Sequence, residues 1–213
     1  MNTIKLLLPL LLIITACTAP APDLGYVPGD VMDIEPLIIG ETIPDITLQN
    51  HQSESVNLLD DNAENTLFVF YRGGWCPFCS AELAELASIE NQLYNLGFNI
   101  VAISPDSPEF LRQTMNDTDI NYTLLSDNMM EASKAFGIAY RLDDDTYQRY
   151  KSNGMDLEER SGQQHHLLPA PAVYLSNPEG IIEFEYVNPD YRQRIDKDVL
   201  MAAARSLVES QNE

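Results

Sequence analysis

The chain has 213 residues, of which 12 are basic and 33 acidic, and its formal net charge is −21 at pH 7. This excess of negative charge disfavours binding to nucleic acids and electrostatic attachment to anionic lipids. A hydrophobic fraction of 45% is enough for a sizeable core. The length suits one ordinary domain or two small ones.

The first residues have the pattern of a signal peptide. Lys5 supplies a positive charge, and residues 6–14 are mostly aliphatic, a run too short for a comfortable membrane span. The sequence Ile14-Thr-Ala-Cys17 follows and resembles the lipobox of bacterial lipoprotein signal peptides. The resemblance implies a signal peptide over residues 1–16, cleavage before Cys17 and lipid attachment to its sulfur. The alternative is that Cys17 is merely part of a hydrophobic leader.

The lipobox resemblance also implies a location. Multiple acyl chains hold a protein stably at a membrane surface, where a single chain does not. Thr18 after the cysteine implies the outer membrane of a bacterial cell envelope, on the periplasmic side. Residues 17–39 then form the lipidated cysteine and a flexible tether, rich in proline and glycine.

Residues 40–213 read as one domain in which strands and helices alternate. The opening β–α–β–α–β pattern, followed by adjacent strands and a final helix, predicts an α/β fold with helices around one central mixed sheet. From periodicity and turn residues we expect strands at 66–71, 99–104, 122–125, 172–176 and 181–187, and helices at 77–96, 108–116, 129–136 and 197–209.

Two cysteines lie where the first of these strands passes into a helix, in the run Trp75-Cys-Pro-Phe-Cys79. Pro77 suits the first turn of a helix, where its missing N–H is no loss. Unpaired N–H groups and the helix dipole at that point favour a thiolate on Cys76. A second thiol one turn away can attack whatever forms on the first and close a disulfide. The pattern therefore indicates redox chemistry.

Two plainer interpretations of the cysteines are a zinc site and a buried inert pair. A zinc site needs two more ligands, but the third cysteine is Cys17, and His165 and His166 stand in a separate polar stretch. An inert pair does not explain the placement at a helix start. The chain has no phosphate loop, nucleotide fingerprint or haem motif, so we expect no cofactor and no metal.

The stretch 139–166 interrupts the pattern of strands and helices. It is rich in acidic residues and glycine and poor in core residues, so we expect an insertion on the surface. Its composition favours a solvated loop over a lid or a partner surface near the active site.

Three segments resemble a known family. Gly40 to Leu48 looks like the entry segment of peroxiredoxins, and Phe70-Tyr71 with Pro77, Cys79-Ser80 and Glu82 resembles their strand, turn and helix around the peroxide-reactive cysteine. Pro171 to Gly180 looks like the late strand and turn of the thioredoxin fold. Over residues 38–211 the chain is similar to peroxiredoxins of the alkyl hydroperoxide reductase/thiol-specific antioxidant group. The resemblance implies a thioredoxin-like fold.

The chain also departs from this family. With Cys79 in the reactive place, Arg72 stands where the signature has Pro and Cys76 where it has Thr. The same run resembles the Trp-Cys-x-x-Cys motif of thioredoxin, with Cys76 as the nucleophile. Peroxiredoxins place an activating Arg just before the late strand, whereas Pro171 here resembles the cis-proline of thioredoxin.

The family resemblance implies a thiol-dependent peroxidase. A thiolate attacks a hydroperoxide and becomes a sulfenic acid, the other cysteine closes a disulfide, and an external dithiol such as thioredoxin restores both thiols. By the peroxiredoxin match, Cys79 attacks and Cys76 resolves. Arg72 is a candidate to stabilise the thiolate or the leaving oxygen, or else forms a salt bridge at the strand end. Trp75 is expected to shield the cysteines or simply to pack in the core.

Two other functions stay open. In a thiol–disulfide oxidoreductase, Cys76 attacks a partner disulfide and Cys79 resolves it, with Pro171, if cis, packed beside Cys76. In a non-enzymatic redox sensor, the cysteines merely respond to oxidant. Arg192 and Arg194 could reach an anionic group near the site, but a solvated face is the favoured interpretation for both.

Overall fold

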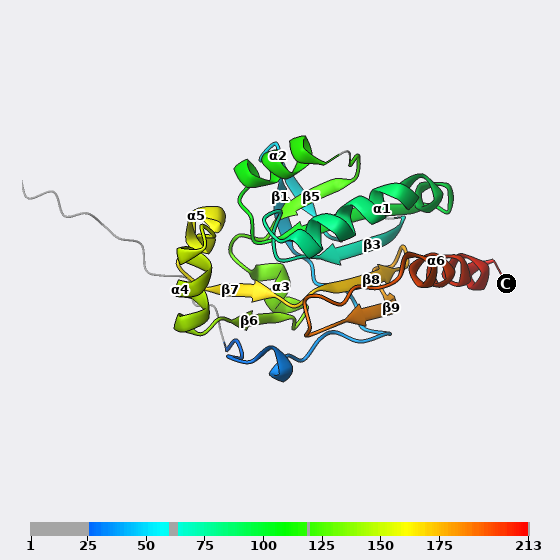
Figure 1. The fold of residues 1–213 in the computed structure, drawn as a ribbon. Coiled ribbons are helices and arrows are strands. Elements are labelled where there is room, and N and C mark those ends of the chain that lie inside the picture. The colour runs from blue at the N-terminus through cyan, green and yellow to red at the C-terminus, as the bar shows by residue number, and fades with distance from the viewer. Residues whose placement is uncertain (1–25, 60–63, 119, 213) are drawn as a thin grey trace, which may run out of the picture.

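The computed structural model describes residues 26–59, 64–118 and 120–212 (Figure 1). The predicted signal peptide, Cys17 and the start of the tether lie outside the described residues. Within these ranges, none of the helices combines the length and the apolar character that crossing a membrane requires.

Seven strands form the central sheet, in the order β2-β1-β5-β4-β3-β8-β9. Strands β3, β4 and β5 run parallel to one another, and the remaining pairs are antiparallel. The sheet is therefore mixed, which confirms the predicted fold class. The strands are β1 (Thr47–Asn50), β2 (Ser55–Asn57), β3 (Asn65–Phe70), β4 (Phe98–Ser104), β5 (Thr123–Ser126), β8 (Ala172–Ser176) and β9 (Ile182–Val187).

Helices cover both faces of this sheet. The helices of the described ranges are η1 (Val31–Asp33), α1 (Pro77–Asn95), α2 (Pro108–Asp117), α3 (Glu131–Ala135), α4 (Asp144–Ser152), α5 (Leu157–Ser161) and α6 (Lys197–Gln211). A separate two-stranded sheet joins β6 (Ala139–Arg141) to β7 (Leu167–Pro169). In Figure 1, α4 and α5 stand together at one end of the molecule, and α6 with the C-terminus lies at the other.

Strand β3 lies at the centre of the core, and all six of its residues are buried. Leu67 and Val69 belong to the hydrophobic cluster that includes α1 and α6. Phe68 and Phe70 belong to the cluster on the opposite face, with α3. Successive side chains of a strand point to opposite faces, so a strand covered on both sides reads as a continuous apolar run. The turn that carries the cysteines follows the end of this strand.

The strands and helices predicted from periodicity are confirmed, with ends that agree within about two residues. The short strands β1, β2, β6 and β7 were not predicted. They have three or four residues each, which is too short for an alternating pattern to stand out from its surroundings.

The prediction of a flexible tether up to residue 39 needs correction for its described part. The Leu37 amide donates to the Phe136 carbonyl at 3.1 Å, and the Arg141 amide donates to the Pro28 carbonyl at 2.8 Å. Val31, Ile34 and Leu37 pack against the core cluster around α3. The prolines and glycines suggested a tether, but these apolar side chains bind the segment to the domain.

The insertion 139–166 is folded, so the prediction of a solvated loop is wrong. Tyr147 and Leu157 are buried, in a cluster with Leu142 and Leu168. Its acidic residues, which suggested a loop, include helix caps. The Asp143 carboxylate accepts the Thr146 amide at the start of α4, and Asp156 accepts two amides at the start of α5. Aspartate is a preferred N-cap because it satisfies these otherwise unpaired donors.

Replacing Gly137 by alanine should destabilise the domain by about 2 kcal/mol or more. Gly137 has a φ of 68°, and an added Cβ would lie 1.9 Å from the carbonyl oxygen of Glu35. Gly154 is the matched control, since its φ is 84° but nothing lies within 4 Å of its added Cβ. Gly154→Ala should cost only the conformational strain, about 1 kcal/mol. Urea unfolding measures both, and equal losses would contradict the tight packing of residue 35 on Gly137.

Candidate active site

The two cysteines occupy the start of α1. Cys76 is the N-cap residue, with extended backbone angles, and Pro77 is the first helical residue, as predicted. The Cys76 amide donates to the Gly73 carbonyl at 3.1 Å and closes the turn that follows β3. Both cysteines are free thiols, and their exposed fractions are only 1% for Cys76 and 0% for Cys79. The site is therefore a pair of covered thiols at a helix N-terminus.

The two thiols have opposite acidities. A hydrogen bond from the Cys79 thiol lowers the pKa of Cys76 to about 6, against the effect of burial. Backbone N–H groups of Cys79 and Phe78 and the charge of Arg72 act in the same direction. The pKa of Cys79 is raised well above its usual value, because Cys79 donates that hydrogen bond and is buried beside a negative sulfur. At neutral pH the pair holds one thiolate, on Cys76, and one thiol.

Arg72 is buried in a cage of aromatic side chains. Its guanidinium lies 4.1 Å from the ring centre of Tyr191 and 5.1 Å from that of Trp75. Its Nη2 donates to the Tyr150 hydroxyl at 2.6 Å. No carboxylate in the described part of the chain pairs with it, so the predicted alternative of a strand-end salt bridge finds no support. Aromatic faces stabilise a buried cation.

Arg194 reaches the second sulfur. Its Nη2 donates to the Cys79 Sγ at 3.4 Å, and its Nε pairs with the Glu82 carboxylate at 2.7 Å. The two side chains of this ion pair are only 11% and 10% exposed. The favoured interpretation of a solvated face is therefore wrong for Arg194. It fits Arg192, whose side chain is 61% exposed and pairs with Asp190.

One sequence signal could have pointed to Arg194. Glu82 falls three residues after Cys79, on the face of the helix that also carries Leu83 and Leu86. A carboxylate on a buried helix face needs a positive partner. Burial raises the pKa of Glu82 to about 7, although Arg194 opposes this effect.

Asp106 fixes the turn before the cysteines. Its carboxylate accepts the Gly74 amide at 2.8 Å and two bonds from Arg160, at 2.8 and 2.9 Å. Gly74 has no room for a side chain, since an added Cβ would lie 2.1 Å from the Thr114 hydroxyl oxygen. Arg160 and Tyr150 both come from the insertion. The insertion thus holds the turn through Arg160 and covers Arg72 through Tyr150.

Pro171 differs from the sequence prediction, whereas His165 and His166 lie outside helices and strands and are held by hydrogen bonds within the protein. No cis peptide bond occurs in the described ranges, so the resemblance of Pro171 to a cis-proline fails, and the residue simply precedes β8. His165 bonds to the Asn128 carbonyl and accepts the Leu167 amide, which gives it a structural role. His166 pairs with Glu158 within the insertion.

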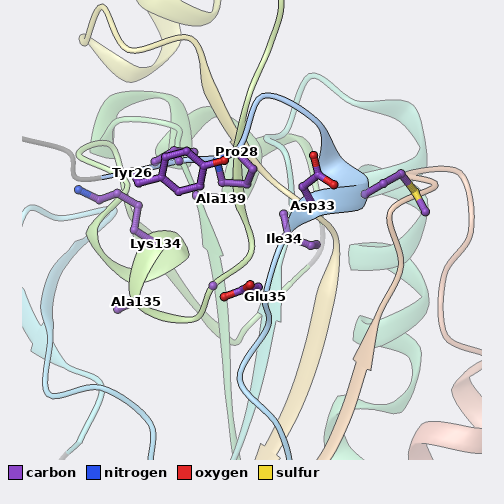
Figure 2. Close-up of a pocket in the computed structure, with 11 residues that line it drawn as sticks. Tyr26, Pro28, Asp33, Ile34, Glu35, Lys134, Ala135 and Ala139 are labelled. Carbon is purple, nitrogen blue, oxygen red and sulfur yellow. The ribbon is translucent and has the colours of Figure 1, made fainter.

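Two spaces in the structure lie near the N-terminal segment and near the insertion. A cavity of about 860 Å³ opens between the N-terminal segment and the α3 region, where Tyr26 and Lys134 lie on one side and Asp33 on the other (Figure 2). A space of only about 10 Å³ lies between Arg72, Trp75 and the insertion. Neither cysteine lines either of these two spaces.

Comparison with known proteins agrees with this geometry. Residues 39–185 match the model of the AhpC/TSA family. The chain is 33% identical over 105 residues to a putative peroxiredoxin bcp of Haemophilus influenzae, covering 49% of this chain and 68% of that protein. It is 30% identical over 105 residues to peroxiredoxin Bcp of Escherichia coli, covering 49% of this chain and 67% of that protein.

A solved structure supports the same fold. The peroxidoxin BcpB of Mycobacterium tuberculosis superposes with a TM-score of 0.61 at 16% identity, covering 79% of this chain and 97% of that one. The family match spans β1 to most of β9 and includes both cysteines of the candidate site. The chain therefore belongs to the AhpC/TSA family, as a peroxiredoxin similar to the Bcp proteins.

Proposed function

We propose that this chain is a thiol-dependent peroxidase that reduces hydroperoxides through Cys76 and Cys79 and is recycled by an external dithiol of the thioredoxin type. The observation that carries the proposal is a pair of buried free cysteines at the start of α1, with the pKa of Cys76 lowered to about 6, inside a domain of the peroxiredoxin family. Family membership supports the oxidoreductase class and the hydroperoxide substrate.

Cys76 is the attacking sulfur in this proposal. Its thiolate attacks the O–O bond and becomes a sulfenic acid, and the released alkoxide or hydroxide takes up a proton. The Cys79 thiol then displaces the hydroxyl group, so that an S–S bond forms and water leaves. The lowered pKa of Cys76 and the raised pKa of Cys79 support this order. It reverses the order that the peroxiredoxin match implied.

Two buried donors are candidates to bind the peroxide. The Nε of Arg72 and the Nε1 of Trp75 are covered and have no hydrogen-bond partner among the described residues. An unpaired buried donor is costly, so such groups often await a ligand. Both side chains flank the turn next to Cys76. We assign them to the peroxide oxygens, where a donor stabilises developing negative charge.

A thiol–disulfide oxidoreductase is the second candidate. The low pKa of Cys76 within a Trp-Cys-x-x-Cys run favours it. Both sulfurs are covered, however, and a small hydroperoxide reaches a covered sulfur with less opening of the surface than a protein disulfide needs.

The proposal places the protein in the bacterial cell envelope. The lipobox-like sequence before Cys17 supports cleavage at that residue, lipid on its sulfur and the periplasmic side of the outer membrane. The peroxidase domain, from residue 40 onwards, would then act at the membrane surface.

Reduced protein should consume hydrogen peroxide far faster than a free thiol does, with sulfenic acid on Cys76 in the Cys79→Ser variant. The Cys76→Ser variant should lose at least about 99% of the rate, because the thiolate is the reactive form. Stopped-flow consumption and mass spectrometry of the dimedone adduct measure both quantities. A reaction no faster than that of a free thiol, together with Cys76-dependent reduction of a test disulfide, would favour the oxidoreductase instead.

Labelling of Cys76 by iodoacetamide should accelerate as the pH rises through about 6 and level off above about pH 7, because the lowered pKa makes the thiolate form there. An ordinary thiol accelerates through about pH 8.5. Cys79→Ala removes the donated hydrogen bond and should move the midpoint upward. Arg192→Gln is the control and should leave it in place. A wild-type midpoint near 8.5 would contradict the proposed thiolate.

Full-length protein expressed in a Gram-negative bacterium should appear in the membrane fraction, with the mass of a lipid on residue 17. The Cys17→Ser variant should lose both, because no sulfur remains to carry the lipid. Fractionation and intact-mass measurement test this, and Cys76→Ser is the matched cysteine control. Wild-type protein that is cleaved at another residue and carries no lipid would exclude the anchor.

A further inference from the structure

Each sulfur of the pair has its own arginine. The charge of Arg72 acts on Cys76, whereas Arg194 donates directly to the Cys79 Sγ. Arg194 lies between β9 and α6, 115 positions further along the chain than Cys79. It is therefore not in the place where the family resemblance puts an activating arginine, which is just before β8.

Three other hydrogen bonds hold the guanidinium of Arg194. Its Nε donates to the Glu82 carboxylate, and its Nη1 donates to the backbone carbonyls of Tyr191 and Gln193. These bonds fix the plane of the group and leave Nη2 directed at the Cys79 sulfur. A nearly buried ion pair is weak evidence for a purely stabilising role, because removing both charges from water is costly.

The contact with Cys79 changes in strength with the state of the sulfur. A thiol sulfur is a weak acceptor, whereas a hydrogen bond from a guanidinium to a thiolate is charge-assisted and strong. In the reduced protein the negative charge resides on Cys76, and Cys79 stays protonated because it donates to that sulfur. After Cys76 becomes a neutral sulfenic acid, the repulsion from a negative sulfur and the hydrogen bond donated to it are both lost. Burial still raises the pKa of Cys79, and the charge of Arg194, which lowers it, then opposes burial alone.

We propose that Arg194 is a catalytic residue of the second step, in which it donates to the Cys79 sulfur as that sulfur attacks the sulfenic acid on Cys76. The S–S bond forms, the S–O bond breaks, and the departing hydroxide combines with the proton that Cys79 released, to leave as water. Glu82 is the positioning residue that orients Arg194. An interaction that is strong only at this stage accelerates this step and not the first. The inference rests on the proposed peroxidase function.

The test separates the two steps in the Arg194→Gln variant of the full chain. Reduced protein is mixed rapidly with hydrogen peroxide and quenched with dimedone at successive times, and the masses report reduced, sulfenic and disulfide forms. We expect the attack rate to change by less than about twofold. We expect disulfide formation to slow by about tenfold or more, the usual effect of losing a hydrogen bond to a charged group. Sulfinic acid on Cys76 should accumulate at high peroxide.

Two further variants control for the fold. Arg192→Gln removes an exposed arginine on the same segment, which pairs only with Asp190 among the described residues, and should change neither step. Arg194→Lys keeps the charge and should recover part of the rate of disulfide formation. If Arg194→Gln fails to fold, the attack rate and the rate of disulfide formation are compared in Arg194→Lys instead.

The outcomes are distinct. Unchanged disulfide formation in both Arg194 variants would overturn the inference, and so would an attack step slowed as much as disulfide formation or a sulfenic acid found on Cys79. Wild-type protein that does not react with peroxide would instead overturn the proposed function itself.

Discussion

The hydrogen bond from the Cys79 thiol to the Cys76 sulfur is the interaction on which the site depends. It is the largest cause of the low pKa of Cys76 and of the high pKa of Cys79. It therefore makes Cys76 the nucleophile and keeps Cys79 protonated until the second step. Two adjacent buried sulfurs cannot both ionise at little cost. The position at the start of α1 adds backbone N–H donors that also lower the pKa of Cys76. The charge of Arg72 acts on Cys76, whereas Arg194 donates to the Cys79 sulfur.

The rest of the fold keeps this bond in place. Strand β3, covered on both faces, ends directly before the turn, and Asp106 clamps that turn to the loop after β4 and to α5. The insertion that carries α4 and α5 completes the surroundings of Arg72 through Tyr150. The site is therefore assembled from the central sheet, from the insertion and from the segment after β9. Loss of any one of these three parts would remove contacts that hold the cysteines or the arginines in place.

Much of this follows from the sequence, and the rest depends on contacts that local patterns do not record. Apolar periodicity located the long helices and the central strands, and Pro77 correctly marked the helix that begins at the cysteines. The acidic residues of the insertion, Asp143 among them, suggested a loop because aspartate serves caps and turns alike. Arg194 was considered but assigned to a solvated face, because its partners, Cys79 and Glu82, lie more than 110 positions away. The resemblance of Pro171 to the cis-proline of thioredoxin was misleading, since the described ranges contain no cis peptide bond.

Trp75 is the only tryptophan of the chain, and it precedes Cys76 directly. Its ring packs 5.7 Å from that of Tyr150 and 5.1 Å from the guanidinium of Arg72. Indole emission responds to nearby charge and to contact with sulfur, so every photon that tryptophan emits from this protein originates beside the reacting atoms. The molecule thus carries its own optical probe, through which oxidation and reduction of the pair can be followed in real time without a label.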